Sequence, residues 1–224
     1  MRLGGKPGVD DDVVVHPGVA EIIEGALGRR ASLGGEQEEG VRPVGHVGGL
    51  RVVPRQAGRI GLADYDTVVI RPPSETFADS FAFHLPDDVV RLHYFGPAHC
   101  DGDIVVHLEK RKVAFLGDLL FHGRFPWLGD CDLDGLIAAL GRVLALDLAV
   151  VVPGHGPPAT LADVARFRDM LLDLRGAVAA AFKAGHSEEA AVREVALPQY
   201  AHLQRYAEWM PLDVRAAYRY LRER

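Results

Sequence analysis

FLGDLLF (115–121) decides how this chain folds, together with the two segments that flank it, GPAHCDGD (96–103) and VVPGHGPP (151–158). Each segment follows an apolar run and presents one polar side chain beyond a glycine or proline: His99, Asp118 or His155. The apolar runs predict buried strands that stop at these glycines and prolines. Side chains at strand ends are held by a rigid sheet while the turn lets them point outward. Imidazole and carboxylate groups placed in this way indicate a metal site.

The composition is that of an ordinary globular protein. The 224 residues carry a formal net charge of −6, and 48% of them are hydrophobic, which is enough for one sizeable core. Cys100 and Cys131 are too few for a disulfide framework, and their spacing matches no zinc knuckle. No apolar stretch approaches the length of a membrane span, and the N-terminus lacks a signal-peptide pattern. We therefore expect a cytoplasmic protein with no membrane partner.

The basic residues do not form a track for nucleic acid. Three of them are consecutive, Lys110, Arg111 and Lys112, and they lie where the apolar run IVVHL (104–108) is followed by KVAFL (112–116), which begins with Lys112. This pattern predicts a β-hairpin with a solvated basic turn. Because the chain as a whole is mildly acidic, we expect no nucleic-acid partner.

Strand patterns dominate the first 160 residues, and helix patterns dominate the rest. The predicted strands cover 11–17, 50–54, 67–72, 81–86, 89–96 and 148–152 in addition to the hairpin. The predicted helices cover 18–28, 133–146 after the N-cap Asp132, 160–185 after a Thr160–Asp163 capping box, a segment capped by Ser187, and 211–224. Residues 29–49 are expected to form a loop. The order predicts a layered α/β domain over 1–185 and a helical extension over 186–224 that packs on it.

The three opening segments, in this order and at these separations, resemble the metallo-β-lactamase-fold hydrolase superfamily. The likeness covers residues 12–160 and includes the stretch LGDLLFHGRFPWLGDCDLDGLIAAL (116–140). The resemblance implies a four-layer αββα sandwich with two zinc ions at one edge. It implies that His99 belongs to the first metal, that His155 belongs to the second, and that Asp118 is the catalytic carboxylate bridging both. It also implies a hydrolase in which metal-bound hydroxide attacks an ester, thioester, lactone or related bond of a small-molecule substrate.

One part of the family's pattern is absent from this sequence. The HxHxDH motif, which supplies two histidines to the first metal and an Asp-His pair to the second, does not occur, and neither does H-x-H. The remaining ligands give each zinc two protein ligands, one of them shared, whereas catalytic zinc uses three. We therefore expect substoichiometric metal and little turnover.

Two explanations of this gap stay open. The segment RLGGKPGVDDDVVVHP (2–17) resembles the part of the family that follows the missing motif, so the chain could begin inside the domain, through a late start site or a truncation. Alternatively, it is a degenerate member that folds without full metal loading. The first explanation predicts exposed strand edges and therefore self-association into a homo-oligomer.

Two other functions fit the same three side chains. One is a non-catalytic or binding protein that retains the fold without a working site. The other is an iron-dependent oxygenase related to persulfide dioxygenases, because two histidines and one carboxylate also suit Fe²⁺. Metal content distinguishes the three, since two zinc ions favour the hydrolase, one iron the oxygenase, and no metal the non-catalytic protein.

His122 and Asp103 are two further candidates for a place beside the substrate. His122 lies four residues beyond Asp118, in a loop expected to border the metals, where it either touches substrate or metal or serves the loop alone. Asp103 either orients the loop of His99 from behind or caps a turn.

Four more side chains lie near these segments. Cys100 and Cys131 are expected to be reduced, unreactive thiols. Phe125 and Trp127 either line the mouth of the pocket or pack in the core, which is the commoner place for such aromatic side chains.

Overall fold

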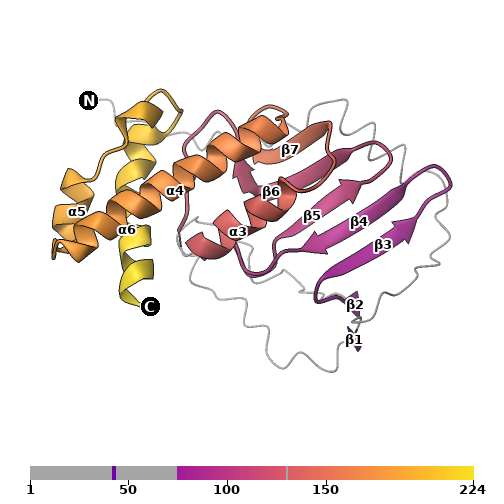
Figure 1. The fold of residues 1–224 in the computed structure, drawn as a ribbon, viewed down its shortest axis with the longest axis horizontal. Coiled ribbons are helices and arrows are strands. Elements are labelled where there is room, and N and C mark those ends of the chain that lie inside the picture. The colour runs from indigo at the N-terminus through magenta and orange to yellow at the C-terminus, as the bar shows by residue number, and fades with distance from the viewer. Residues whose placement is uncertain (1–41, 44–74, 130) are drawn as a thin grey trace, which may run out of the picture.

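A five-stranded mixed sheet forms the centre of the fold (Figure 1). The computed structural model describes residues 42–43, 75–129 and 131–224. The strands lie side by side in chain order: β3 (Ser80–His84), β4 (Val89–Tyr94), β5 (Ile104–Leu108), β6 (Val113–Phe121) and β7 (Val150–His155). Neighbours from β3 to β6 are antiparallel, and β7 is parallel to β6. A separate two-residue pair joins β1 (Arg42–Pro43) to β2 (Glu75–Thr76).

The β5–β6 hairpin forms as the sequence predicts, but its basic turn is anchored and not simply solvated. Arg111 donates to Asp87 over 2.9 Å and to the fully buried Asp88 over 2.6 Å, so the turn is tied to the β3–β4 turn. Asp88 also accepts from the backbone N–H groups of Val89 and Lys110. A buried carboxylate needs such partners, because leaving it unpaired would be costly.

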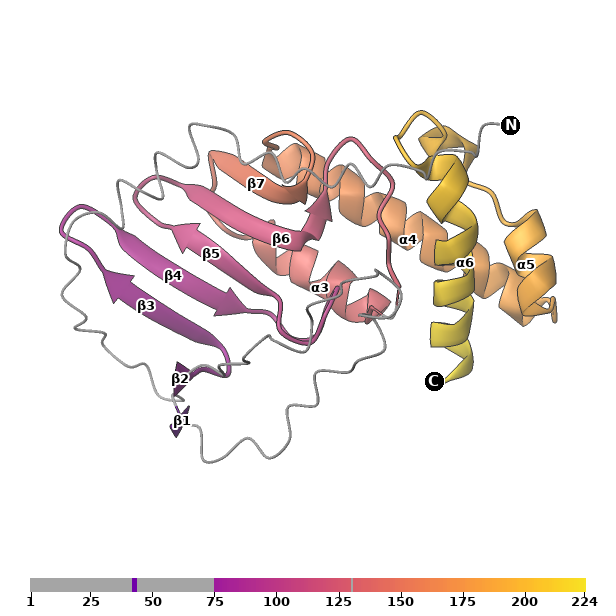
Figure 2. The same cartoon turned by 180° about the vertical axis from the view of Figure 1, so that it is seen from behind.

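Helices cover one face of the sheet, as the two opposite views show (Figure 2). The parallel β6–β7 connection runs through α3 (Leu133–Val143), which begins at the predicted N-cap: Asp132 accepts a hydrogen bond from the backbone N–H of Gly135. α3 ends at Val143, three residues before the predicted end. The apolar stripe of α3 is buried against the sheet and α4, and fully buried side chains of β6, α3 and α4 meet there: Leu116, Leu120, Leu136, Leu140, Val164 and Leu171. Each such side chain stabilises the fold by roughly 1.5–3 kcal/mol.

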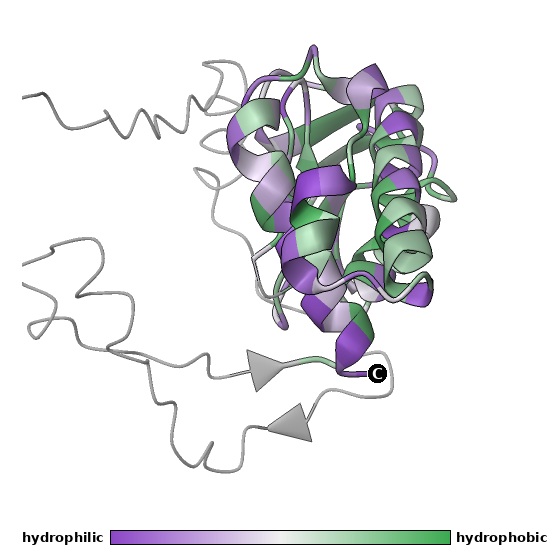
Figure 3. Ribbon diagram, turned by 90° about the vertical axis from the view of Figure 1, so that its left-hand side faces the viewer, coloured by the Kyte–Doolittle hydropathy of each residue, from purple (hydrophilic) through white to green (hydrophobic). Residues whose placement is uncertain are grey.

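The C-terminal part is helical, and two of its predicted starts are confirmed. α4 (Leu161–Lys183) opens with the Thr160–Asp163 capping box, and α5 (Glu188–Glu194) is capped by Ser187. A short 3₁₀ turn (Pro198–Tyr200) leads to α6 (Tyr206–Arg222). In Figure 3 these helices carry hydrophilic and hydrophobic segments in alternation, as expected for helices packed on one side only.

The predicted start of the last helix at Pro211 is wrong, because α6 begins five residues earlier and contains this proline. A proline inside a helix removes one backbone hydrogen bond. The early turns are held by packing instead, since Tyr206 meets Phe125 edge to face at 5.2 Å and Met210 is buried. Tertiary contacts therefore outweigh the local cost of the proline.

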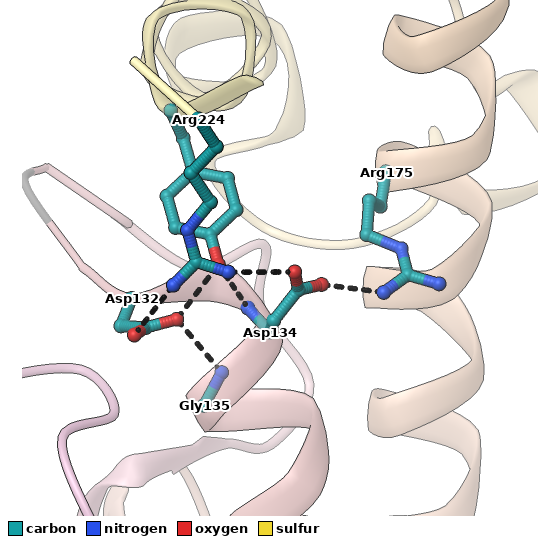
Figure 4. Close-up of polar contacts among 6 residues, drawn as sticks. Asp132, Asp134, Gly135, Arg175 and Arg224 are labelled. Atoms are coloured by element: carbon teal, nitrogen blue, oxygen red, sulfur yellow. Dashed lines mark hydrogen bonds and ion pairs between the residues drawn. The ribbon is translucent and has the colours of Figure 1, made fainter. Parts of the chain in front are cut away.

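A polar cluster ties α6 and α4 to the start of α3 (Figure 4). The Tyr220 hydroxyl donates to Asp132 over 2.8 Å, and Arg224 reaches both Asp132 and Asp134. Asp134 also pairs with Arg175 of α4. The end of the chain thus holds the helix that crosses between β6 and β7.

The described residues confirm the α/β class and the order of strands and helices beyond residue 75. They contain the five-stranded sheet with helices on one of its faces and the short β1–β2 pair. Several predicted elements lie outside the described residues: the strands at 11–17, 50–54 and 67–72, the helix at 18–28 and the loop at 29–49.

Candidate metal centre

Asp118 lies within β6, not beyond its end. The expectation that this strand stops at Gly117 is wrong, since β6 continues to Phe121. The pairing with β7 is irregular here, however, with register shifts on both sides of Gly117, which has a φ of +53°. An extra residue in one strand twists it and re-aims its side chains. The Asp118 carboxylate is 44% exposed while Leu116, Leu119 and Leu120 of the same strand are buried, so the irregularity turns it out of the core.

His155 is the last residue of β7 and faces Asp118. Its Nε2 lies 3.3 Å from Oδ1 of Asp118, and its ring stacks on Phe121 with the centroids 4.7 Å apart. Gly154 makes this approach possible, because a Cβ at that position would lie 2.6 Å from Asp118 Oδ1. The next turn is equally tight: at Gly156, with a φ of +98°, a Cβ would lie 1.9 Å from the carbonyl oxygen of His122.

His99 reaches Asp118 from the loop that follows β4. Its Nε2 lies 2.9 Å from the carbonyl oxygen of Trp127. Because a carbonyl only accepts, Nε2 carries the proton and Nδ1 is left with its lone pair. Nδ1 lies 3.9 Å from Oδ2 of Asp118. In the same loop, Asp103 accepts a hydrogen bond from the backbone N–H of Cys100 over 2.7 Å and so closes the turn beside His99.

The structure therefore brings all three predicted ligands together around one carboxylate. Each oxygen of Asp118 faces one imidazole nitrogen, and the Phe121 ring lies near both imidazoles. Two ligands about 2.0 Å from a tetrahedral zinc lie about 3.3 Å apart, which the His155–Asp118 pair matches and the His99–Asp118 pair exceeds. Among the described residues, no three or more His, Cys, Asp or Glu side chains are gathered closely enough to hold a metal ion. The imidazole and carboxylate groups, including the free Nδ1 of His99, are suitable ligands for a metal ion. The distance from His99 Nδ1 to Asp118 Oδ2 is longer than that between two ligands of one bound zinc.

Comparison with known proteins identifies the family. The sequence model of the metallo-beta-lactamase superfamily matches residues 11–155. The chain belongs to this superfamily. Its members are mostly hydrolases and typically bind metal. No curated protein matches the chain.

Solved structures are similar to this chain at low sequence identity. The stereoselective inverting sec-alkylsulfatase Pisa1 from Pseudomonas sp. matches with 18% identity and a TM-score of 0.52, over 68% of this chain and 26% of its own. A double mutant of the same enzyme gives 18% identity and a TM-score of 0.57, over 69% and 27%. A metallo-beta-lactamase from Pontibacter korlensis has 24% identity and a TM-score of 0.42, over 53% and 61%. The chain thus spans less than two thirds of the length of these structures.

The backbone N–H of His122 donates to the carbonyl oxygen of His155, while the His122 side chain is directed toward the start of α4. Its Nδ1 lies 2.9 Å from the carbonyl oxygen of Pro157, and its Nε2 lies 3.3 Å from Asp163 of α4. It is therefore joined to the start of α4, and no contact with Asp118 is recorded. Its partner Asp163 is 41 positions away, and the sequence pattern predicted for Asp163 only a role in the capping box of α4.

The two cysteines do not add ligands to the centre of this superfamily member. Both are free of disulfides. Burial and the hydrogen bond to Asp103 raise the pKa of the Cys100 thiol, so it stays protonated and is a poor ligand or nucleophile. Cys131 is buried in the core. Phe125 is also fully buried, whereas Trp127 is half exposed and contributes to the site through its backbone carbonyl.

Asp213 supports the loop beside His99 and was not predicted from the sequence. It is fully buried on α6, its Oδ1 accepts from the backbone N–H of Leu128, and its Oδ2 has no partner. Burial raises the pKa of this carboxyl to about 8. Leu128 follows Trp127, so Asp213 fixes the loop that holds His99. Its position on the buried stripe of α6, beside Met210 and Val214, is the signal that could have revealed it.

No helix in the described part of the chain is long and apolar enough to cross a membrane.

Proposed function

We propose that this chain is a metal-dependent hydrolase that acts on an ester, thioester, lactone or related bond of a small molecule. The observation that carries the proposal is the placement of Asp118 between His155 and His99, with one carboxylate oxygen toward each. A carboxylate shared in this way suits a zinc pair, and its charge offsets part of the repulsion between two dications. Superfamily membership supports the reaction class.

A divalent metal bound at Asp118 would supply Lewis-acid polarisation of the scissile bond and a water of lowered pKa. The residues of the chain prepare this position. Trp127 fixes the tautomer of His99 through its carbonyl group, and ligand orientation of this kind is worth about 10- to 100-fold in metal affinity. The buried Phe121 ring places an apolar surface under both imidazoles and limits the access of water from the core side.

We expect the metal affinity of this chain to be low. The sequence contains no H-x-H pair, and the three side chains provide fewer ligands than two catalytic zinc ions require. The wide spacing at His99 is consistent with weak binding. The proposal therefore includes substoichiometric zinc in the purified protein and slow turnover.

The test combines zinc titration of chelator-treated protein with assays on a panel of esters, thioesters and lactones. Asp118→Asn is compared with Asp169→Asn, a matched change of an exposed aspartate on α4. We expect Asp118→Asn to weaken zinc binding at least about tenfold and to abolish turnover, with no effect of the control. Unchanged zinc binding and turnover in Asp118→Asn would refute the proposal. One tightly bound iron in place of zinc would favour the oxygenase instead.

A further inference from the structure

A cavity of about 390 Å³ lies where the end of β6, the first turns of α4 and the residues after the 3₁₀ turn meet. Pockets for small molecules typically have volumes of about 300–1,000 Å³. The cavity adjoins the metal centre through Phe121, whose ring also stacks on His155. None of the three candidate metal ligands lines it, so it is a space beside the metal centre and not the centre itself.

One wall of the cavity is apolar and rigid. Phe121, Phe167 and Met170 line it, and each is less than a tenth exposed. Phe121 and Phe167 stack on one another with their ring centroids 6.2 Å apart. This wall can take the hydrocarbon part of a ligand without rearrangement of the core.

Arg124 supplies the cavity with a cation that has no counter-ion among the described residues. Its guanidinium lies over the Trp209 ring at 4.7 Å, its Nε is buried without a hydrogen-bond partner, and it forms no ion pair with any described residue. A guanidinium that stacks by its face keeps its N–H edge for an acceptor in its plane. A buried N–H group without an acceptor is unfavourable. An anionic ligand that accepts hydrogen bonds from the N–H edge of Arg124 would therefore be stabilised.

The other charged groups of the lining are already paired. Burial alone would raise the pKa of Asp163, but hydrogen bonds from Thr160 and Arg166 lower it to about 2, so it is ionised. Its charge is met by the Arg166 guanidinium. Burial and the hydrogen bond to Asp173 raise the pKa of Tyr200 to about 12, so this side chain is neutral.

The lining thus holds two arginines against one carboxylate. The surplus is a single positive charge, and it resides on Arg124. A dianion would bring a second negative charge close to Asp163, so a monoanion fits the balance better.

We propose that this cavity binds a small organic monoanion, with its anionic group on the Arg124 guanidinium and its apolar body against Phe167 and Met170. The site is distinct from the metal centre and does not rest on the proposed hydrolase function. Its test can be made on metal-free protein.

The first experiment titrates the full chain with hexanoate in the presence of a chelator, by calorimetry. Hexanamide is the neutral analogue of the same shape, and acetate lacks the apolar body. We expect saturable binding of hexanoate and at least about tenfold weaker binding of both analogues. Equal binding of hexanoate and hexanamide, or no binding of hexanoate, would overturn the proposal.

The second experiment compares Arg124→Gln with Arg168→Gln. Arg168 is an arginine of α4 that pairs with Asp169 and does not line the cavity. We expect Arg124→Gln to weaken hexanoate binding at least about tenfold and Arg168→Gln to leave it unchanged. Equal affinities of the two variants would refute the role of Arg124.

A third measurement needs no change to Arg124 and covers the case in which that variant does not fold. Met170 lines the cavity, whereas the buried Met210 on α6 does not. With methyl-labelled methionine, hexanoate should shift the Met170 methyl resonance and leave that of Met210 in place, with Met210→Leu providing the assignment. A shift of Met210 alone, or of neither, would contradict the proposal. Because zinc is excluded throughout, failure here leaves the hydrolase proposal standing, and the reverse also holds.

Discussion

The backbone N–H of Leu128 donates a hydrogen bond to the fully buried Oδ1 of Asp213 over 2.9 Å, which joins α6 to the loop beside His99. The preceding residue, Trp127, accepts from His99 through its carbonyl oxygen. A helix near the C-terminus thus helps to set the orientation of a candidate metal ligand more than a hundred positions earlier in the chain.

This arrangement predicts a pH dependence of stability that Asp213→Asn removes. Burial raises the pKa of Asp213 in the folded state to about 8 from an ordinary value of 3.8. Between these values the folded state holds a proton that the unfolded state has released, so the contribution is complete below pH 3.8 and is lost as the pH rises toward 8. The free energy of unfolding should fall by up to about 1.4 kcal/mol per pH unit in this window. Urea unfolding from pH 5 to 8.5 should show this slope in the parent chain and a flatter one in Asp213→Asn. The same slope in both would contradict the assignment.

Gly154→Ala should weaken metal binding, because the added Cβ has no room beside Asp118 and Gly117. The added Cβ would lie 2.6 Å from Asp118 Oδ1 and 2.6 Å from the backbone of Gly117, so the carboxylate must move. We expect zinc affinity to fall at least about tenfold, measured by calorimetry. The control is Gly176→Ala in α4, where a Cβ meets nothing within 4 Å and should stabilise the helix by about 0.5–1 kcal/mol. Zinc binding by Gly154→Ala at the parent affinity would show that this contact does not position Asp118.

Asp163→Asn should destabilise the protein at neutral pH but not in strong acid. The hydrogen bonds from Thr160 and Arg166 outweigh burial and hold the pKa of Asp163 at about 2, below its usual 3.8. A lowered folded-state pKa contributes stability above pH 3.8 that is lost as the pH falls to 2. The loss should be about 1–3 kcal/mol at pH 7 and should vanish near pH 2, as measured by urea unfolding. Asp169→Asn, on the exposed side of α4, should change stability by less than about 0.5 kcal/mol. A loss that persists undiminished in acid would point to packing and not to charge.

The polar cluster at the start of α3 predicts unequal effects of two substitutions. Tyr220→Phe removes a hydroxyl that donates to the N-cap Asp132 over 2.8 Å and should cost about 1 kcal/mol. Arg224→Gln removes a more exposed ion pair with the same carboxylate and should cost less, about 0–1 kcal/mol. Thermal unfolding of the two variants would test the ranking, and a larger loss for Arg224→Gln would reverse it.

The sequence predicted those parts of the fold that depend on local pattern. The hairpin before Val113, the N-cap Asp132 and the capping box at Thr160 follow from short-range chemistry and are confirmed. The bulge at Gly117 and the proline inside α6 were not foreseen, because each depends on a partner strand or helix distant in sequence.

The candidate metal centre likewise has one part that the sequence predicts and another that it does not. Its three candidate ligands were identified from their position after apolar runs, and the structure brings them together. The hydrogen bonds of His99 with Trp127 and of Leu128 with Asp213 span 28 and 85 positions, which no local pattern reveals. The His122 side chain pairs with Asp163 of α4, a contact over 41 positions that no local pattern reveals either.

Anomalous scattering at the zinc edge, from crystals grown with zinc, would show whether His99, Asp118 and His155 form one metal centre. We expect a zinc peak about 2.0–2.2 Å from an Asp118 oxygen and an imidazole nitrogen of His155, with His99 drawn toward the same centre. Zinc bound elsewhere in the protein, with these three side chains free of metal, would refute the proposed centre.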